Sequence, residues 1–235
     1  MGRNYFWNKM IPCYCAILVL LLILVQAGSK TATVLVEQSP IRNRTCIAID
    51  AGHGGIDGGA VSISGIPESQ INLQIAQRLN DLLHLFGYQT YMLRTTDTSL
   101  HTDGTTINAQ KNSDLKHRVN MVTDSNASLL ISIHQNTFSD KRYSGAQVFY
   151  HTDENSISLA NQMQNNFIQT LNPNSNRKPK AAKGIYLMEH ISCPAILLEC
   201  GFLTNIQEES KLRNSEYQKQ LCGVIAATVS SYMNE

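Results

Sequence analysis

Short apolar runs alternate with longer segments in which apolar residues recur every three or four positions. The short runs are rich in Ile, Leu, Val and Tyr and predict strands at residues 46–50, 89–94, 128–134, 145–151 and 194–199. The longer segments predict amphipathic helices at residues 71–86, 160–171 and 217–232. Gly87 is a natural stop for the first helix. This alternation predicts the α/β class, with a central, largely parallel sheet covered by helices on both faces.

No Pro/Gly-rich linker interrupts the pattern, so we predict one domain at residues 44–235. The segment before it has a different character. Residues 1–27 combine a basic start with a charge-free apolar stretch and predict a signal peptide or an uncleaved membrane anchor over residues 10–29. Val25 and Ala27 fit a cleavage site, and residues 28–43 read as a tether. We therefore expect an exported protein that acts outside the cytoplasm.

The net charge and the cysteine positions argue against a nucleic-acid partner and against a cysteine-ligated metal site. The formal net charge is +1, and removing residues 1–27 leaves 17 basic and 18 acidic residues, a net charge of −1. Neither value favours a nucleic-acid partner. The domain cysteines are Cys46, Cys193, Cys200 and Cys222, and none forms a CxxC pair, which argues against a cysteine-ligated zinc site. Export permits disulfides, but the apolar surroundings favour free, buried thiols.

Ionisable residues gather where predicted strands end. His53 follows the first strand after a short glycine-containing turn, while His134 and Glu199 end two later strands. Glu68 opens the first helix. Functional groups of parallel sheets collect beyond the carboxyl ends of the strands, so these four side chains are predicted to converge.

Each residue also has a simpler explanation. Glu68 would stabilise a helix start through the helix dipole alone, and a single histidine at a strand end is commonly a hydrogen-bonded surface residue. Glu199 directly follows five apolar residues, where an unpartnered charge would be costly. The glycines around His53 also resemble a phosphate-binding turn, but Asp57 stands where that motif needs its third glycine.

Convergence of all four accounts for more of the pattern. Two imidazoles and one carboxylate form a catalytic zinc set with an open fourth position, and a second carboxylate can then accept a proton from water. The small residues flanking His53 are expected to let a bulky substrate lie against the backbone beside the metal. Asp50 is a candidate partner for a ligating imidazole, or alternatively a capping or solvent-facing aspartate.

Four segments, in order, carry a family resemblance: "IDAGHGG", "PESQINLQIAQRL", "LLISIHQN" and "AILLECGFLTN". Together they resemble the zinc-dependent N-acetylmuramoyl-L-alanine amidases of the amidase 3 family, over about residues 46–232. The resemblance implies a twisted mixed sheet and one Zn²⁺ ion bound by His53, Glu68 and His134. It also implies that Glu199 is the catalytic residue.

The same resemblance implies the substrate. The expected reaction is hydrolysis of the amide between N-acetylmuramic acid and the L-alanine of the peptidoglycan stem peptide, and the sequence is similar to germination-specific amidases that act on spore cortex. Two alternatives remain: a non-catalytic or partner-dependent peptidoglycan-binding protein on the same fold, and a zinc hydrolase of another exported amide. Because the domain has near-zero charge and contains no wall-binding repeat, we also expect help from an exported targeting or activating protein.

Overall fold

The computed structural model describes residues 45–234, so the predicted leader and tether lie outside the described residues. The strands are β1 (Cys46–Ala51), β2 (Gln89–Met92), β3 (Leu129–Asn136), β4 (Gln147–Tyr150), β5 (Lys180–Ala181) and β6 (Ala195–Phe202). The helices are α2 (Glu68–Leu85), α3 (Ile107–Asp124), α4 (Glu154–Thr170), α5 (Tyr186–His190), α6 (Ile206–Leu212) and α7 (Ser215–Tyr232). Within residues 45–234, no helix has both the length and the apolar character needed to cross a membrane.

The six strands form one mixed sheet in the order β2-β1-β3-β6-β4-β5. β1 pairs in parallel with β2 and β3, and β3 pairs in parallel with β6. β4 is antiparallel to β6, and the short β5 is parallel to β4. The predicted α/β class is confirmed, and the antiparallel β4 makes the sheet mixed.

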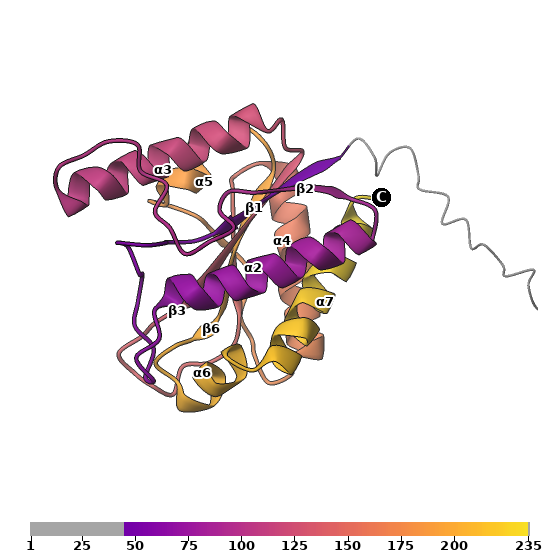
Figure 1. Cartoon of the computed structure of the whole chain (residues 1–235). Coiled ribbons are helices and arrows are strands. Elements are labelled where there is room, and N and C mark those ends of the chain that lie inside the picture. Colours follow the sequence, from indigo (N-terminus) through magenta and orange to yellow (C-terminus); the bar gives the residue numbers. More distant parts are fainter. Residues whose placement is uncertain (1–44, 235) are drawn as a thin grey trace, which may run out of the picture. The chain divides into compact units, whose positions relative to one another are not determined.

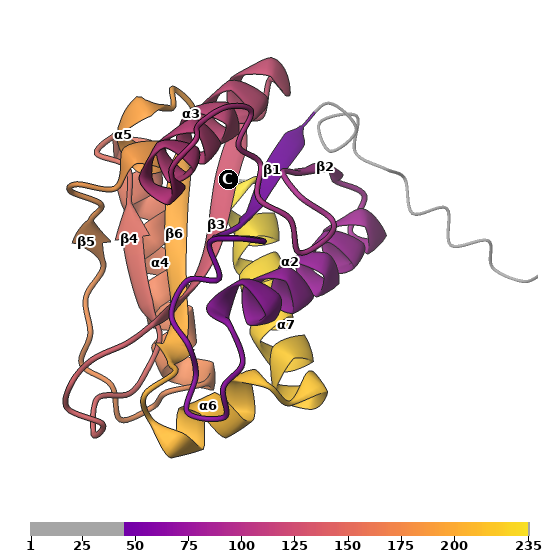
Figure 2. The same cartoon turned by 60° about the vertical axis from the view of Figure 1, so that its left-hand side comes forward.

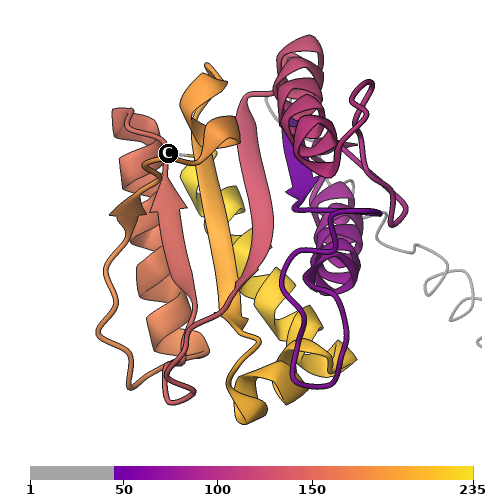
Figure 3. The ribbon, with the colours of Figure 1, turned by 90° about the vertical axis from the view of Figure 1, so that its left-hand side faces the viewer.

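Helices cover both faces of this sheet (Figures 1 and 2). Alternate strand residues such as Ile47, Ile131 and Leu198 pack against α2, α4 and α7 in the larger core. The residues between them, such as Ala48 and Leu130, pack against α3 and α5 in a smaller core. Figure 3 shows that α3 and α5 lie over only one end of their face, near the amino ends of β3 and β6.

The predicted strands and helices are present, and the end of α2 confirms the role given to Gly87. This residue has a φ of +85°, and its N–H donates to the His84 carbonyl at 2.9 Å. A residue with a side chain would adopt this conformation at a cost, so glycine ends the helix here.

The sequence pattern did not predict α3, α5, α6 or β5. The case of α3 is instructive, because its buried residues are Ser113, Arg118 and Val122. A helix whose inward face carries an arginine and a serine has no apolar stripe to detect.

The four cysteines in the described part of the chain are free, as the apolar surroundings predicted. Cys200 and Cys222 are buried, while Cys46 and Cys193 are partly buried.

Candidate metal centre

Four predicted site residues come from four different elements of the fold. His53 follows β1, His134 lies near the end of β3, Glu199 lies on β6 and Glu68 is the first residue of α2. Since β1, β3 and β6 are parallel neighbours, their carboxyl ends meet at one edge of the sheet. The structure therefore brings these residues together, as the sequence predicted.

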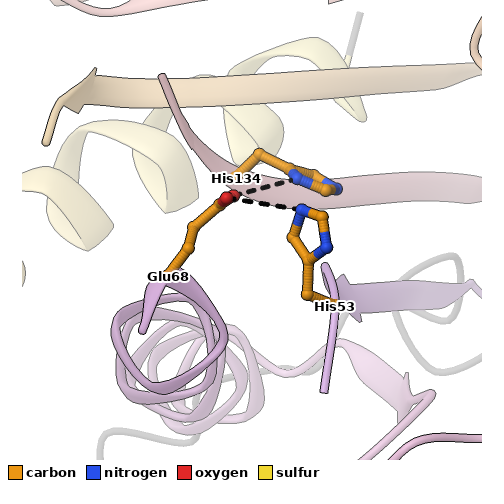
Figure 4. A group of neighbouring side chains, drawn as sticks. All are labelled: His53, Glu68 and His134. Atoms are coloured by element: carbon orange, nitrogen blue, oxygen red, sulfur yellow. Dashed lines mark hydrogen bonds and ion pairs between the residues drawn. The ribbon is translucent and has the colours of Figure 1, made fainter. Parts of the chain in front are cut away.

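Glu68 is the centre of the cluster (Figure 4). Its carboxylate is buried, with Oε2 3.3 Å from His53 Nε2 and Oε1 3.2 Å from His134 Nδ1. The two imidazole rings meet edge to face, with their centroids 5.0 Å apart. Neutral protein groups hold the carboxylate as well: the Ala60 N–H donates to Oε2 at 3.1 Å and the Gln135 N–H donates to Oε1 at 2.9 Å.

The ionisation of Glu68 suits a metal ligand. Burial alone would raise its pKa, but the hydrogen bond with His134 and the charges of both imidazoles lower the pKa to about 2. The side chain is therefore a carboxylate at neutral pH, which is the form that binds a cation.

The cluster fits zinc. His53, Glu68 and His134 each offer one ligand atom, and all three atoms lie within 4.8 Å of one another. Two ligands held about 2.0–2.1 Å from a tetrahedral zinc ion lie roughly 3.3 Å apart. The contacts of 3.3 Å from His53 to Glu68 Oε2 and of 3.2 Å from His134 to Glu68 Oε1 are close to that separation. Two nitrogens and one oxygen are the donor set of many catalytic zinc sites.

Asp57 supports His53 from the side away from the cluster. Asp57 Oδ2 accepts a hydrogen bond from His53 Nδ1 at 3.0 Å, which leaves the Nε2 lone pair directed at Glu68. The other oxygen, Oδ1, is 2.8 Å from Lys111 Nζ on α3. This carboxylate–histidine arrangement fixes the tautomer of a metal-binding imidazole.

The sequence made Asp50 a candidate for that role, with a capping or solvent-facing position as the alternative, and the structure places Asp50 elsewhere. Asp50 is buried in an ion pair with Arg118 and accepts a hydrogen bond from Ser132 Oγ at 2.7 Å. These contacts, with Arg118 foremost against the opposing effect of burial, lower the pKa of Asp50. It is thus neither a capping residue nor solvent-facing, and its hydrogen bonds in the described structure go to Arg118 and Ser132, not to an imidazole.

Two buried arginines hold the turn that carries His53, and the sequence analysis did not identify them. Arg118 donates to the carbonyls of Ala51 at 3.0 Å and His53 at 2.7 Å. Arg94 donates to the carbonyls of Ala51 at 2.7 Å and Gly52 at 3.0 Å. Three successive carbonyls are therefore fixed by guanidinium groups, which pins a turn in which His53 itself has a φ of +62°.

The glycines beside His53 have a different purpose from the one predicted. A Cβ atom on Gly52 would lie 2.2 Å from the His134 ring, and one on Gly54 would lie 2.3 Å from the Thr98 carbonyl oxygen. The protein's own atoms fill this space, so the prediction that it admits a substrate is wrong. Gly52 is required because the His134 ring lies directly against the backbone that precedes His53.

Glu199 stands beside the cluster without joining it. It lies opposite His134 in the pairing of β3 with β6, so both side chains stand on the same face of the sheet. Burial raises the pKa of Glu199 to about 7, with the negative charge of Glu68 adding to the rise and the charge of His134 opposing it. Its Oε2 atom is buried and accepts no hydrogen bond from the described residues. A buried acceptor without a donor is costly unless another molecule supplies one.

Comparison with known proteins finds a matching family and similar relatives. Residues 47–231 match the protein family described as N-acetylmuramoyl-L-alanine amidase. The germination-specific N-acetylmuramoyl-L-alanine amidase of Bacillus subtilis (strain 168) is 38% identical over 192 residues, which cover 80% of each chain.

Solved structures show the same fold. The CwlD amidase from Clostridioides difficile, solved in complex with the GerS lipoprotein, is 34% identical with a TM-score of 0.78, covering 81% of this chain and 98% of that one. An N-acetylmuramoyl-L-alanine amidase from Clostridium difficile 630 is 31% identical with a TM-score of 0.72, covering 82% of this chain and 98% of that one.

Proposed function

The chain belongs to the N-acetylmuramoyl-L-alanine amidase family, and from this membership and the geometry of the cluster we propose that it is a zinc-dependent peptidoglycan hydrolase. The bond cleaved is the amide between N-acetylmuramic acid and the L-alanine of the stem peptide. The observation that carries the proposal is the convergence of His53, Glu68 and His134, with Glu199 opposite His134.

His53, Glu68 and His134 hold the metal ion in this proposal. A bound Zn²⁺ supplies a Lewis acid that polarises the scissile carbonyl and makes water a better nucleophile at neutral pH. Asp57 keeps the His53 imidazole in the tautomer whose Nε2 lone pair points into the cluster.

Glu199 is the proton carrier in this proposal. A general base works best with a pKa near the working pH, and the pKa of Glu199 is about 7. Glu199 accepts the proton of the attacking water and returns it to the amide nitrogen as the C–N bond breaks. The products are a free lactyl carboxylate on the sugar and a free amino group on the alanine. The Oε2 atom that has no donor in the structure is available to receive that proton.

The site of action and the partner form a further part of the proposal. We place the reaction outside the cytoplasm, in the cell wall or spore cortex, because the similar Bacillus subtilis enzyme is germination-specific. The similar CwlD amidase was solved in complex with a lipoprotein, which supports an exported partner for this chain. We expect the isolated domain to digest peptidoglycan slowly and to digest it faster when the partner is added. Full-rate digestion by the isolated domain would argue against a partner.

Digestion of purified peptidoglycan followed by mass spectrometry tests the reaction. Free stem peptides with an L-alanine amino terminus are expected, whereas cleavage between two amino acids would indicate a different amide. The roles of the two glutamates are tested by metal analysis of Glu199→Gln and Glu68→Gln.

Glu199→Gln keeps the shape of the side chain but cannot accept a proton at neutral pH. It is expected to bind zinc like the parent and to lose about 10²–10⁴ in rate. Glu68→Gln is expected to lose zinc and activity together, because it removes one of three ligands. Zinc loss in Glu199→Gln combined with retention in Glu68→Gln would show that the two roles are reversed.

A further inference from the structure

The line of paired residues that contains His134 and Glu199 continues across the sheet onto β4. Glu199 on β6 pairs with His134 on one side and with Gln147 of β4 on the other. Gln147 Oε1 is 3.4 Å from Arg177 Nη1, in the segment between α4 and β5. Neighbouring strands lie about 5 Å apart. Arg177 is therefore one strand spacing and one glutamine side chain away from the Glu199 position.

A β-bulge turns an aromatic ring toward the same face. His134 pairs with Glu199 but Asn136 pairs with Phe202, so β6 contains one extra residue between the two pairs. Such a bulge reverses the alternation of side chains beyond it. Phe202 consequently shares a face with Asn136 and His134. The Arg177 guanidinium lies over the Phe202 ring, 4.9 Å from its centroid.

Arg177 is held in place but keeps its charge unpaired. Its Nε donates to the Ser144 carbonyl at 3.1 Å, and the stacking on Phe202 fixes the plane of the guanidinium. Arg177 forms no ion pair with any carboxylate of residues 45–234. It is half-buried and lines a pocket of about 910 Å³ beside α6. The same segment of the chain also carries Lys178, Lys180 and Lys183, which are exposed and have no ion-pair partner in the described part of the chain.

We propose that Arg177 is a specificity-determining residue that binds a carboxylate on the peptide side of the scissile amide. This inference rests on the proposed function and specifies which group of the substrate the enzyme recognises. A guanidinium with a fixed plane matches a carboxylate through two parallel hydrogen bonds. An extended peptide advances about 3.3–3.6 Å per residue. One strand spacing of about 5 Å plus the reach of the Gln147 side chain exceeds one such step, so the carboxylate lies beyond the L-alanine of the stem peptide.

The test compares two soluble muropeptide substrates, one with free stem-peptide carboxylates and one in which they are amidated. The parent is expected to have a KM about tenfold lower for the free acid, with similar kcat values. Arg177→Gln should raise KM for the free acid about tenfold and leave the amidated substrate unchanged. Arg142→Gln is the matched control, because Arg142 lines the same pocket but is exposed and paired with Asp140. It should change neither KM.

Two outcomes would overturn the inference: a parent that cleaves both substrates with equal KM, or an Arg177→Gln variant that loses the same factor on both. Comparing the two substrates needs only the parent, so the test stands even where Arg177→Gln folds poorly. Arg177→Lys, which keeps the charge but not the planar fork, should give a KM between those of the parent and Arg177→Gln. A parent that releases stem peptide from neither substrate would refute the proposed function instead.

Discussion

Asp57→Asn should weaken zinc binding without removing a zinc ligand. Asp57 Oδ2 accepts the His53 Nδ1 proton at 3.0 Å, and this contact keeps Nε2 unprotonated toward Glu68. Asparagine has the same size, but its neutral amide is a weaker acceptor. Its NH₂ group can also donate to Nδ1, which favours the tautomer with a proton on Nε2.

The structure sets the expected magnitude. Substitution of the groups that support metal ligands commonly costs 10–100-fold in metal affinity. The Asp57 side chain is 25% exposed, and its second oxygen contacts Lys111 Nζ at 2.8 Å. Solvent and the lysine charge both reduce the influence of the carboxylate on His53, so the low end of the range applies. We expect a loss of about tenfold, or ~1.4 kcal/mol.

The measurement is a zinc titration of the metal-free protein against a chromophoric chelator of known affinity. Asp97→Asn is the matched control, because Asp97 is similarly exposed and accepts the Gly55 N–H at 3.2 Å in the same region. It contacts neither imidazole in the described structure and should leave the affinity unchanged. The reasoning is refuted if Asp57→Asn binds zinc as tightly as the parent, or if both variants weaken it equally.

Three other predictions follow from the same structure. Gly52→Ala should abolish zinc binding, because the new methyl group would lie 2.2 Å from the His134 ring; Gly223→Ala in α7, where a methyl group meets nothing within 4 Å, should bind zinc like the parent. Arg118→Met should reduce the free energy of unfolding by about 3–5 kcal/mol in urea titrations, because it leaves the Asp50 carboxylate buried without its cation; a loss below ~1 kcal/mol would contradict this. A reporter fused after Lys30 should be found outside the cytoplasmic membrane, and a purely cytoplasmic signal would argue against export by residues 1–27.

The sequence predicted the parts of this fold that depend on apolar periodicity. The strands around Ile49, Ile131 and Leu197 and the helices α2, α4 and α7 bury regular apolar faces and are visible as patterns. α3 is held by the polar contacts of Arg118, which depend on a partner 68 residues away in the chain. The direction of β4 is likewise a property of its pairing with β6 and leaves no trace in the composition of β4.

The site likewise has a part that could be predicted from the sequence and a part that could not. The ends of parallel strands can be located from the sequence, so the convergence of His53, His134 and Glu199 was predictable. The supporting groups were not, because their contacts are set by turn geometry. Asp57 is four residues after His53, but only the positive φ of His53 and the paired hydrogen bonds between Gly54 and Asp57 turn its carboxylate toward the ring. The bulge that places Phe202 on the same face as His134 depends on the register between β3 and β6, so the sequence pattern does not reveal it.

The three proposed metal ligands lie on segments that are distant in sequence, at residues 53, 68 and 134. An ion bound by all of them cross-links the β1 turn, the start of α2 and the end of β3. Such a site does not exist in the unfolded chain, so the binding energy of the ion adds to the stability of the native state. At a free zinc concentration 100 times the dissociation constant, the gain is about 2.7 kcal/mol. The metal supply of the compartment would then govern how long the protein survives proteolysis there, independently of its catalytic rate.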